Sequence, residues 1–189
     1  MKLSEAFSEI KALVAEVIQV HNADYPAAAV WWEDEDPPAY VPVNIATCEL
    51  GMVSLRDESV REVDSYDEDL DQWKKNQSTL KLMSVQFKFE SISTTPNPLA
   101  LETQSYVSQI LQTEDGRQRA KARGLAVLGN PQLITTPRRR TSDGRLVECS
   151  ITEFRFRFEY HFSDTPVVTQ YVIKEVIQEP TITVPGEEE

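Results

Sequence analysis

The chain has 189 residues, 40% of them hydrophobic, and its 31 acidic and 19 basic residues give a net charge of −12. This length predicts one domain with enough apolar material to bury a core. The negative charge argues against a protein that binds nucleic acid by neutralising phosphates, and the lack of a run of about eighteen apolar residues argues against a membrane span. Cys48 and Cys149 fall in predicted strands, where we expect small buried side chains in a reducing cytosol.

The N-terminal residues predict a helix. Apolar side chains recur there at helical spacing and form one stripe, which indicates an amphipathic helix over residues 3–21. Ser4 is suited to cap its start, because a serine hydroxyl accepts hydrogen bonds from the free amides of a first helical turn. We expect the apolar stripe of this helix to pack against a sheet.

Prolines and polar residues interrupt residues 22–39 and predict a loop. Trp31 and Trp32 lie in this loop beside four acids. Either one tryptophan caps the core, or the pair offers an aromatic contact to a partner. A strand is predicted over residues 40–48, continuing as strand or turn to residue 56. Pro42 places it at a sheet edge or at its own start, because proline has no amide to donate.

Acidic side chains dominate residues 57–78, where apolar residues are sparse and irregularly spaced. This composition predicts a long mobile loop between two strands, and a loop of this length within a domain is usually functional or disordered. As a hypothesis, its acids contact a partner; otherwise they form a solvated surface. These acids are Asp57, Glu58, Glu62, Asp64, Asp67, Glu68, Asp69 and Asp71.

A strand and two helical pieces are predicted next. Residues 79–92 alternate apolar and polar side chains, and a change of phase near residue 82 predicts a bulge or bend there. Helical spacing extends over residues 98–113. After a break at Asp115–Gly116, a second helical piece covers residues 117–128 and carries four basic side chains before its apolar end.

A long hairpin is predicted over residues 131–162, with its turn at Ser142–Gly144. Its second arm ends in EFRFRFEYHF (residues 153–162), which places aromatic side chains on one face of a strand and charged ones on the other. The apolar phase changes just before this stretch and predicts a bulge or twist near Thr152–Glu153. With Trp31 and Trp32, the candidates for a subunit interface are Arg138, Arg139, Arg140, Arg145, Arg155 and Arg157.

Together these elements predict an α+β fold: a mostly antiparallel β-sheet packed with an N-terminal amphipathic helix and a second helical segment, and one long β-hairpin. We expect residues 1–178 to form a single domain and residues 179–189 an extended C-terminal arm. The sequence contains no catalytic, zinc-binding or phosphate-binding motif, so we expect no enzymatic activity, no metal and no cofactor.

The order of elements resembles the tail terminator proteins of long-tailed bacteriophages, also called neck terminator or tail-completion proteins. The similarity lies in the N-terminal helix, the entry PPAYVPV to the first strand (Pro37–Val43) and the late aromatic strand (Glu153–Phe162). It implies a structural virion subunit of a hexameric ring that ends the tail tube and joins it to the head-side connector. It also implies assembly in the host cytoplasm and a final location in the virion neck or tail.

The resemblance implies partners as well: further copies of the chain, the tail tube protein, and a connector or neck protein. The resemblance further implies that DNA passes through the lumen of the ring without specific binding, with the acids of residues 57–71 lining this lumen, and that there is no membrane contact. Other interpretations stay open. The chain is also compatible with another neck, tail tube or baseplate subunit, with a small non-viral binding domain or enzyme, or with an acidic mimic of DNA. The basic stretch between Arg117 and Arg145 argues against the last of these.

Overall fold

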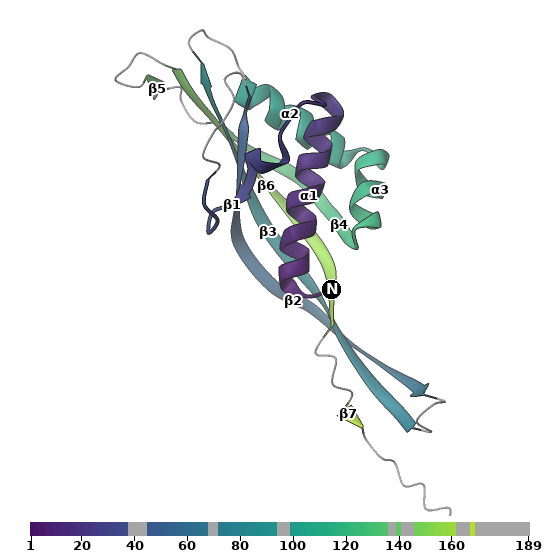
Figure 1. The fold of residues 1–189 in the computed structure, drawn as a ribbon. Helices are drawn as coiled ribbons and strands as arrows, with labels where there is room; N and C mark the ends of the chain where they lie inside the picture. Colours follow the sequence, from purple (N-terminus) through teal and green to yellow (C-terminus); the bar gives the residue numbers. More distant parts are fainter. Residues whose placement is uncertain are drawn as a thin grey trace, which may run out of the picture.

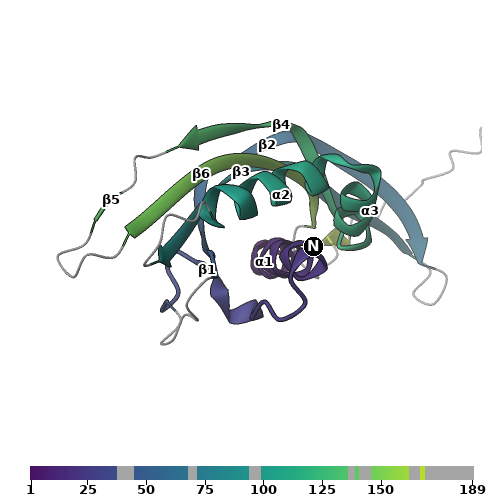
Figure 2. The same ribbon diagram turned by 90° about the horizontal axis from the view of Figure 1, so that it is seen from above.

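In a computed structural model of this chain, the structure describes residues 1–37, 45–67, 72–93, 99–135, 139–140, 146–161 and 167–168. Within them, three α-helices lie on one face of a curved sheet (Figures 1 and 2). No described helix is long and apolar enough to cross a membrane. The predicted α+β class is confirmed.

The helices are α1 (Leu3–His21), α2 (Leu99–Gln112) and α3 (Glu114–Ala122), with a short 3-10 helix, η1, at Ala27–Ala29. The strands are β1 (Val30–Trp32), β2 (Thr47–Asp67), β3 (Gln72–Ser93), β4 (Leu125–Thr135), β5 (Arg139–Arg140), β6 (Leu146–His161) and β7 (Val167–Val168). The main path through the sheet is β1-β2-β3-β6-β4, while β5 pairs with β6 and β7 pairs with β3. β1 runs parallel to β2, and the other neighbours are antiparallel.

The core lies between the helices and the inner face of the sheet (Figure 2). The alternation in β6 is confirmed, because Phe154, Phe156 and Phe158 are buried while Arg155 is exposed. The ring centroids of Phe87 and Phe154 lie 4.7 Å apart across the β3–β6 pair. The apolar stripe of α1 belongs to the same core, and the buried residues of this helix are Ala6, Ile10, Leu13, Val14, Ala15, Val17 and Ile18. Each fully buried aromatic or aliphatic side chain of this kind contributes about 1.5–3 kcal/mol relative to exposure.

The acidic segment is mainly strand, so the prediction of a loop over residues 57–78 is wrong. Residues 57–67 belong to β2 and residues 72–78 to β3, and their antiparallel pairing continues to Asp67↔Gln72. A polar strand needs no apolar face to persist when a neighbouring strand supplies its backbone hydrogen bonds, and composition does not reveal that pairing. The hairpin extends beyond the helices (Figure 1). Glu68, Asp69 and Asp71 lie outside the described residues.

The bulges of the β2–β3 pair lie on the opposite strand from the predicted one. β2 contains one extra residue between Met52 and Ser54, and another between Asp57 and Ser59. β3 itself pairs with β6 without a shift through residue 82, so the predicted bulge there is wrong. Each extra residue of β2 shifts the sheet faces on which the following β2 side chains lie relative to those of β3. The sequence of one strand alone therefore does not show which strand of the pair contains the bulge.

β6 also keeps one register with β3 through Thr152–Glu153, so β6 itself has no bulge in that pairing. The irregularity lies on the partner strand, between Leu128 and Gln132 of β4. Glu148, Ser150 and Thr152 continue the buried face of the phenylalanines. The apparent change of phase therefore arises because the core becomes polar at this end of the sheet.

Other boundaries differ from the sequence prediction. Residues 30–32 form β1 within the predicted loop, because the segment pairs with the start of β2. The helix predicted over residues 117–128 ends at Ala122, where Gly124 adopts a φ of 71° and turns the chain into β4. The first arm of the long hairpin accordingly begins at Leu125 rather than residue 131, since β4 pairs with β6 from its first residue. The strand start over residues 40–44 and the turn at 142–144 lie outside the described residues.

Candidate functional site

Two arginines of the predicted interface, Arg155 and Arg157, lie on the sheet face that the helices leave uncovered. Arg155 is exposed there in the middle of β6. Arg157, two residues on, donates from Nε to Oε2 of Glu58 at 2.6 Å. Glu58 is the extra residue of the second β2 bulge, and β3 runs between the two partners. The ion pair therefore ties β2 to β6 across the intervening strand.

The Arg157–Glu58 pair also explains a buried leucine on this outer face. Leu82 of β3 stands between Arg56 and Arg157 in the register, yet only 4% of it is exposed. Long charged side chains cover apolar surface with their methylene stems while their ends remain in water. Arg157 thus has a structural role within one subunit, in addition to its predicted role between subunits.

Asp57, the first acid of the predicted lumen set, also has a partner in its own chain. Lys81 Nζ lies 2.5 Å from Asp57 Oδ1 and 4.9 Å from the ring centroid of Tyr160. Further along β2, Glu62, Asp64 and Asp67 lie in the hairpin, and the register sets Asp64 opposite Lys75. Two of the predicted lumen acids, Asp57 and Glu58, are therefore held at the base of the hairpin by ion pairs.

The two tryptophans differ in their surroundings. Trp32 is 6% exposed, its ring centroid lies 4.7 Å from that of Phe7, and its Nε1 donates to the Phe7 carbonyl at 3.1 Å. The interpretation of a core cap therefore holds for Trp32. Trp31 is half-buried, and its contact with a partner stays a prediction.

The remaining interface candidates are placed by backbone alone or not at all. Arg139 and Arg140 form β5, opposite Val147 and Leu146 of β6. Arg138 and Arg145 lie outside the described residues, so a partner role for these four arginines stays a prediction. The cysteines are better defined: Cys48 is fully buried, as predicted, whereas Cys149 is only partly buried. Burial raises the pKa of the Cys48 thiol well above its ordinary value, so this side chain stays protonated.

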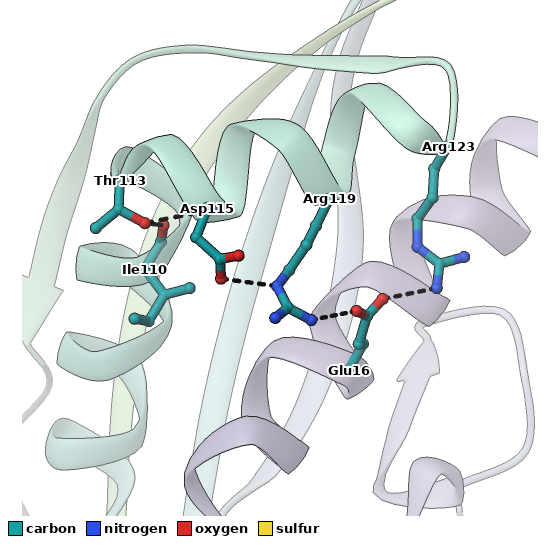
Figure 3. Close-up of polar contacts among 7 residues, drawn as sticks. Glu16, Ile110, Thr113, Asp115, Arg119 and Arg123 are labelled. Atoms are coloured by element: carbon teal, nitrogen blue, oxygen red, sulfur yellow. Dashed lines mark hydrogen bonds and ion pairs between the residues drawn. The ribbon is translucent and has the colours of Figure 1, made fainter.

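An ionic network between α1 and α3 was not predicted (Figure 3). Glu16 of α1 accepts from Arg119 and, at 2.8 Å, from Arg123 Nη2. Arg119 Nε also lies 2.8 Å from Asp115, and Arg123 Nη1 lies 2.7 Å from Glu9. The network joins helices that are about a hundred positions apart in the chain.

This network fixes the charge state of Glu16. The hydrogen bond from Arg123 holds the pKa of Glu16 below its ordinary range, and partial burial opposes that shift. In turn, the carboxylate of Glu16 raises the pKa of Arg123. The (i, i+4) spacing of Asp115 and Arg119 was a visible signal for a local pair, but nothing in the sequence identified α1 as the second partner.

A polar cluster lies under α2, where the inner face of β6 carries no aromatic residues. Glu148 is 7% exposed, and its Oε2 accepts from the Ala100 amide in the first turn of α2 at 3.3 Å. Ser150 Oγ lies 3.4 Å from Gln104 Oε1, and Gln104 Nε2 donates to Ser108 Oγ at 3.0 Å. A carboxylate at a helix N-terminus satisfies free amides and opposes the positive end of the helix dipole. The cluster thereby fixes α2 on the sheet.

A shallow groove of about 470 Å³ lies beside α1. Phe7, Lys11, Ala15, Trp32 and Glu35 are among its lining residues. Lys11 Nζ and Glu35 Oε2 lie 2.6 Å apart, and this hydrogen bond is the main cause of the lowered pKa of Glu35. Within the described residues, no group of three or more histidine, cysteine, aspartate and glutamate side chains is arranged to hold a metal ion.

No protein-family model matches the chain, and no curated protein sequence matches it. The described arrangement is that of a framework: ion pairs hold α3 to α1, β2 to β6 and β2 to β3. Its surface features with a capacity for binding are the uncovered sheet face and the projecting hairpin of β2 and β3.

Proposed function

We propose that the protein is a structural virion subunit that assembles with copies of itself into a ring. This ring ends the tail tube of a long-tailed bacteriophage and joins it to the head-side connector. The proposal takes its class and its expected hexameric state from the resemblance of the N-terminal helix, Pro37–Val43 and Glu153–Phe162 to tail terminator proteins. Its physical support comes from the β2–β3 hairpin.

The single observation that carries the proposal is the hairpin that leaves the body of the subunit. Past Val60↔Thr79 the two strands stay paired as far as Asp67↔Gln72 (Figure 1). Val60 is 65% exposed at the point where the helical cover ends. A two-stranded ribbon is at best marginally stable alone in water, and a long exposed strand edge is a surface on which another chain can pair. A neighbouring subunit would supply the missing contacts.

Charge is consistent with a ring through which DNA passes. The chain carries a net charge of −12, and Glu62, Asp64 and Asp67 lie along the projecting part of β2. Acidic groups that faced a lumen would repel the phosphate backbone and keep DNA from binding during transit. The same hairpin is also compatible with a tail tube, baseplate or other neck subunit, so the identity of the partner decides between these roles.

The deciding experiment is native mass spectrometry of the purified protein with negative-stain imaging, followed by co-sedimentation with tail tubes. We expect a ring with a central hole, either in solution or on tube ends. The matched variant replaces residues 62–77 with a two-residue type I′ turn between Arg61 and Ser78, which shortens the hairpin but keeps the covered part of the sheet. It should retain a cooperative unfolding transition like that of the wild type and lose the ring. A protein that stays monomeric and does not bind tubes would contradict the proposal.

A further inference from the structure

Among the described residues, the edge of β2 that faces away from β3 is unpaired over most of its length. β1 covers it from Cys48 to Leu50, and the Glu33 amide adds one bond to the Leu50 carbonyl. Among the described residues, no strand pairs with this edge from Gly51 to Asp67. The bulges of β2 lie near Val53 and Glu58, and from Ser59 onward the register is unbroken. Backbone donors and acceptors along this stretch are therefore available to another chain.

The opposite end of the sheet has a second open edge. β4 is the last strand of the main path and pairs with β6 on one side only, among the described residues. Its regular part runs from Leu125 to Leu128, before the irregularity at Gly129–Pro131. Ala126 is exposed there on the same sheet face as Arg157.

We infer that the open edge of β2 in one subunit pairs with the open edge of β4 in the next, so that the sheet continues from copy to copy. This inference rests on the proposed ring and specifies its subunit contact. The contact is head-to-tail, and a head-to-tail contact generates a closed ring when the rotation between copies closes. Three antiparallel steps separate β2 from β4, so the two strands run in opposite directions. A rotation about an axis roughly along the strands would therefore join them in the more stable antiparallel manner.

Charge selects β4 over a second β2 as the partner. Residues 57–67 of β2 contain five acids and one base: Asp57, Glu58, Glu62, Asp64 and Asp67 against Arg61. Asp57 and Glu58 are already paired with Lys81 and Arg157, so Glu62, Asp64 and Asp67 provide the acidic charge. Residues 117–135, which span most of α3 and all of β4, contain four bases and no acid, and two of these bases, Arg119 and Arg123, are already paired with Glu16. Arg117 and Lys121 are exposed on α3, which contacts β4. A β2–β2 contact across a two-fold axis would bring like charges together, whereas β2 against β4 brings opposite charges together.

Disulfide cross-linking between two variants, each with one added cysteine, tests the inference. Both carry Cys149→Ser, and the buried Cys48 is left in place. One adds Ser59→Cys on β2 and the other Ala126→Cys on β4; both positions are exposed and lie on the helix-free face. An isotope label on one variant identifies mixed dimers by intact mass. Arg56→Cys and Arg61→Cys extend the β2 series on the same face, because successive side chains of a strand alternate between faces.

The matched control is Val60→Cys, which is exposed but lies on the opposite face of β2 from Ser59 and Arg61. Each β2 variant is oxidised in a mixture with Ala126→Cys. We expect at least one of Arg56→Cys, Ser59→Cys and Arg61→Cys to give several-fold more mixed covalent dimer than Val60→Cys gives. If the ring forms only on tail tubes, the mixture is oxidised there. This excess of mixed dimer over the Val60→Cys control should disappear when Arg117→Glu and Lys121→Glu are added to the β4 variant.

The outcomes separate the two proposals. A ring, in solution or on tubes, without the mixed dimer would overturn the edge pairing and leave the ring itself intact. Cross-linking that is equal for Ser59 and Val60 would also overturn it, because strand pairing requires a dependence on the face. A predominance of Ser59–Ser59 dimers would assign a two-fold β2 contact instead. A monomer that forms no ring even with tubes would overturn both the proposed function and the edge pairing.

Discussion

Arg157 Nε and Glu58 Oε2 lie 2.6 Å apart on the helix-free face of the sheet, with β3 between their strands. The sequence suggested both as contact residues, the arginine for a subunit interface and the glutamate for a lumen or partner. The structure pairs them with each other. A change of charge at Arg157 therefore alters the single chain itself, whereas Arg155 is exposed in the middle of β6.

Charge reversal separates these two arginines. Arg157→Glu places two acids side by side over Leu82 and should lower the free energy of unfolding, while Arg155→Glu should leave it nearly unchanged. The pair itself is partly exposed, so its own contribution is about 0.2–1 kcal/mol. Urea unfolding of the single variants and of the swap Arg157→Glu with Glu58→Arg measures this. Recovery of stability in the swap is expected; a swap no more stable than Arg157→Glu alone would show that the pair is not the cause.

The strands that face the core could be predicted from the sequence, because their side chains alternate between buried apolar and exposed polar residues. The aromatic face of β6 and the stripe of α1 are examples, since each apolar position meets the core directly. The hairpin between residues 57 and 78 was not predictable in this way. Its two strands are held together by backbone hydrogen bonds, and their polar side chains give no sequence signal of that pairing.

The same distinction applies to the candidate site, where patterns along one strand could be predicted and contacts between distant segments could not. Arg155, Arg157 and the base of the acidic segment could be found from sequence, since charged residues on one strand face are visible as a pattern. The partners could not, because Glu58 meets Arg157, and Glu16 meets Arg123, only after distant segments fold together. The polar inner face at Glu148 and Ser150 was concealed for a related reason: α2 satisfies these side chains, and the sequence shows only an interrupted apolar pattern.

Gly116 shows why the break between α2 and α3 lies where it does. Thr113 caps α3, and its Oγ1 accepts from the Gly116 amide at 3.2 Å. A Cβ on Gly116 would lie 2.1 Å from the Ile110 carbonyl oxygen at the end of α2. Glycine in the first turn of α3 is therefore required by the close approach of the two helices, although glycine is otherwise a poor helix former.

Gly116→Ala should accordingly destabilise the protein. In an unconstrained helix this substitution stabilises by about 1 kcal/mol, but overpacking against backbone costs about 1–3 kcal/mol. The free energy of unfolding in urea is the measurement. Gln118→Ala, at an exposed position of the same helix, is the control and should have little effect. A Gly116→Ala variant more stable than the wild type would contradict the close contact.

The Glu16–Arg123 pair predicts a contribution to stability that depends on acid pH. The pKa of Glu16 is lowered in the fold, chiefly by the hydrogen bond from Arg123. Its contribution is therefore fully present above the unfolded pKa of about 4.3 and is lost as the pH falls through the lower folded value. Glu16→Gln should reduce stability at neutral pH by up to about 1 kcal/mol, with the difference from wild type shrinking below pH 4 or so.

Urea midpoints of wild type and Glu16→Gln across this range of pH test the prediction. Ala23→Ser, at an exposed position in the turn after α1, adds no titratable group, serves as the control and should parallel the wild type. Added salt should narrow the gap between Glu16→Gln and wild type, because these side chains are partly exposed. A gap that persists undiminished in acid would assign the effect of the substitution to packing rather than to charge.

The buried hydroxyl of Tyr25 predicts a contribution to stability that is lost at alkaline pH. Its Oη donates to the buried Ala46 carbonyl at 2.9 Å, which ties the segment after α1 to the start of β2. Burial is the main reason that its pKa lies above the ordinary value, and the neighbouring Cys48 adds to the shift. The neutral phenol is thus favoured in the fold. Its contribution to stability is fully present below the unfolded pKa of about 10 and declines as the pH rises beyond it.

Spectrophotometric titration measures this directly. In the folded protein, the tyrosinate absorbance should fall short of the value for all six tyrosines, and the missing part should appear on unfolding. Tyr25→Phe should abolish the shortfall due to this residue and lose about 1–3 kcal/mol at neutral pH, because the Ala46 carbonyl is left buried without this donor. If the folded wild type and Tyr25→Phe show the same shortfall, Tyr25 ionises within the fold and its hydroxyl is open to solvent.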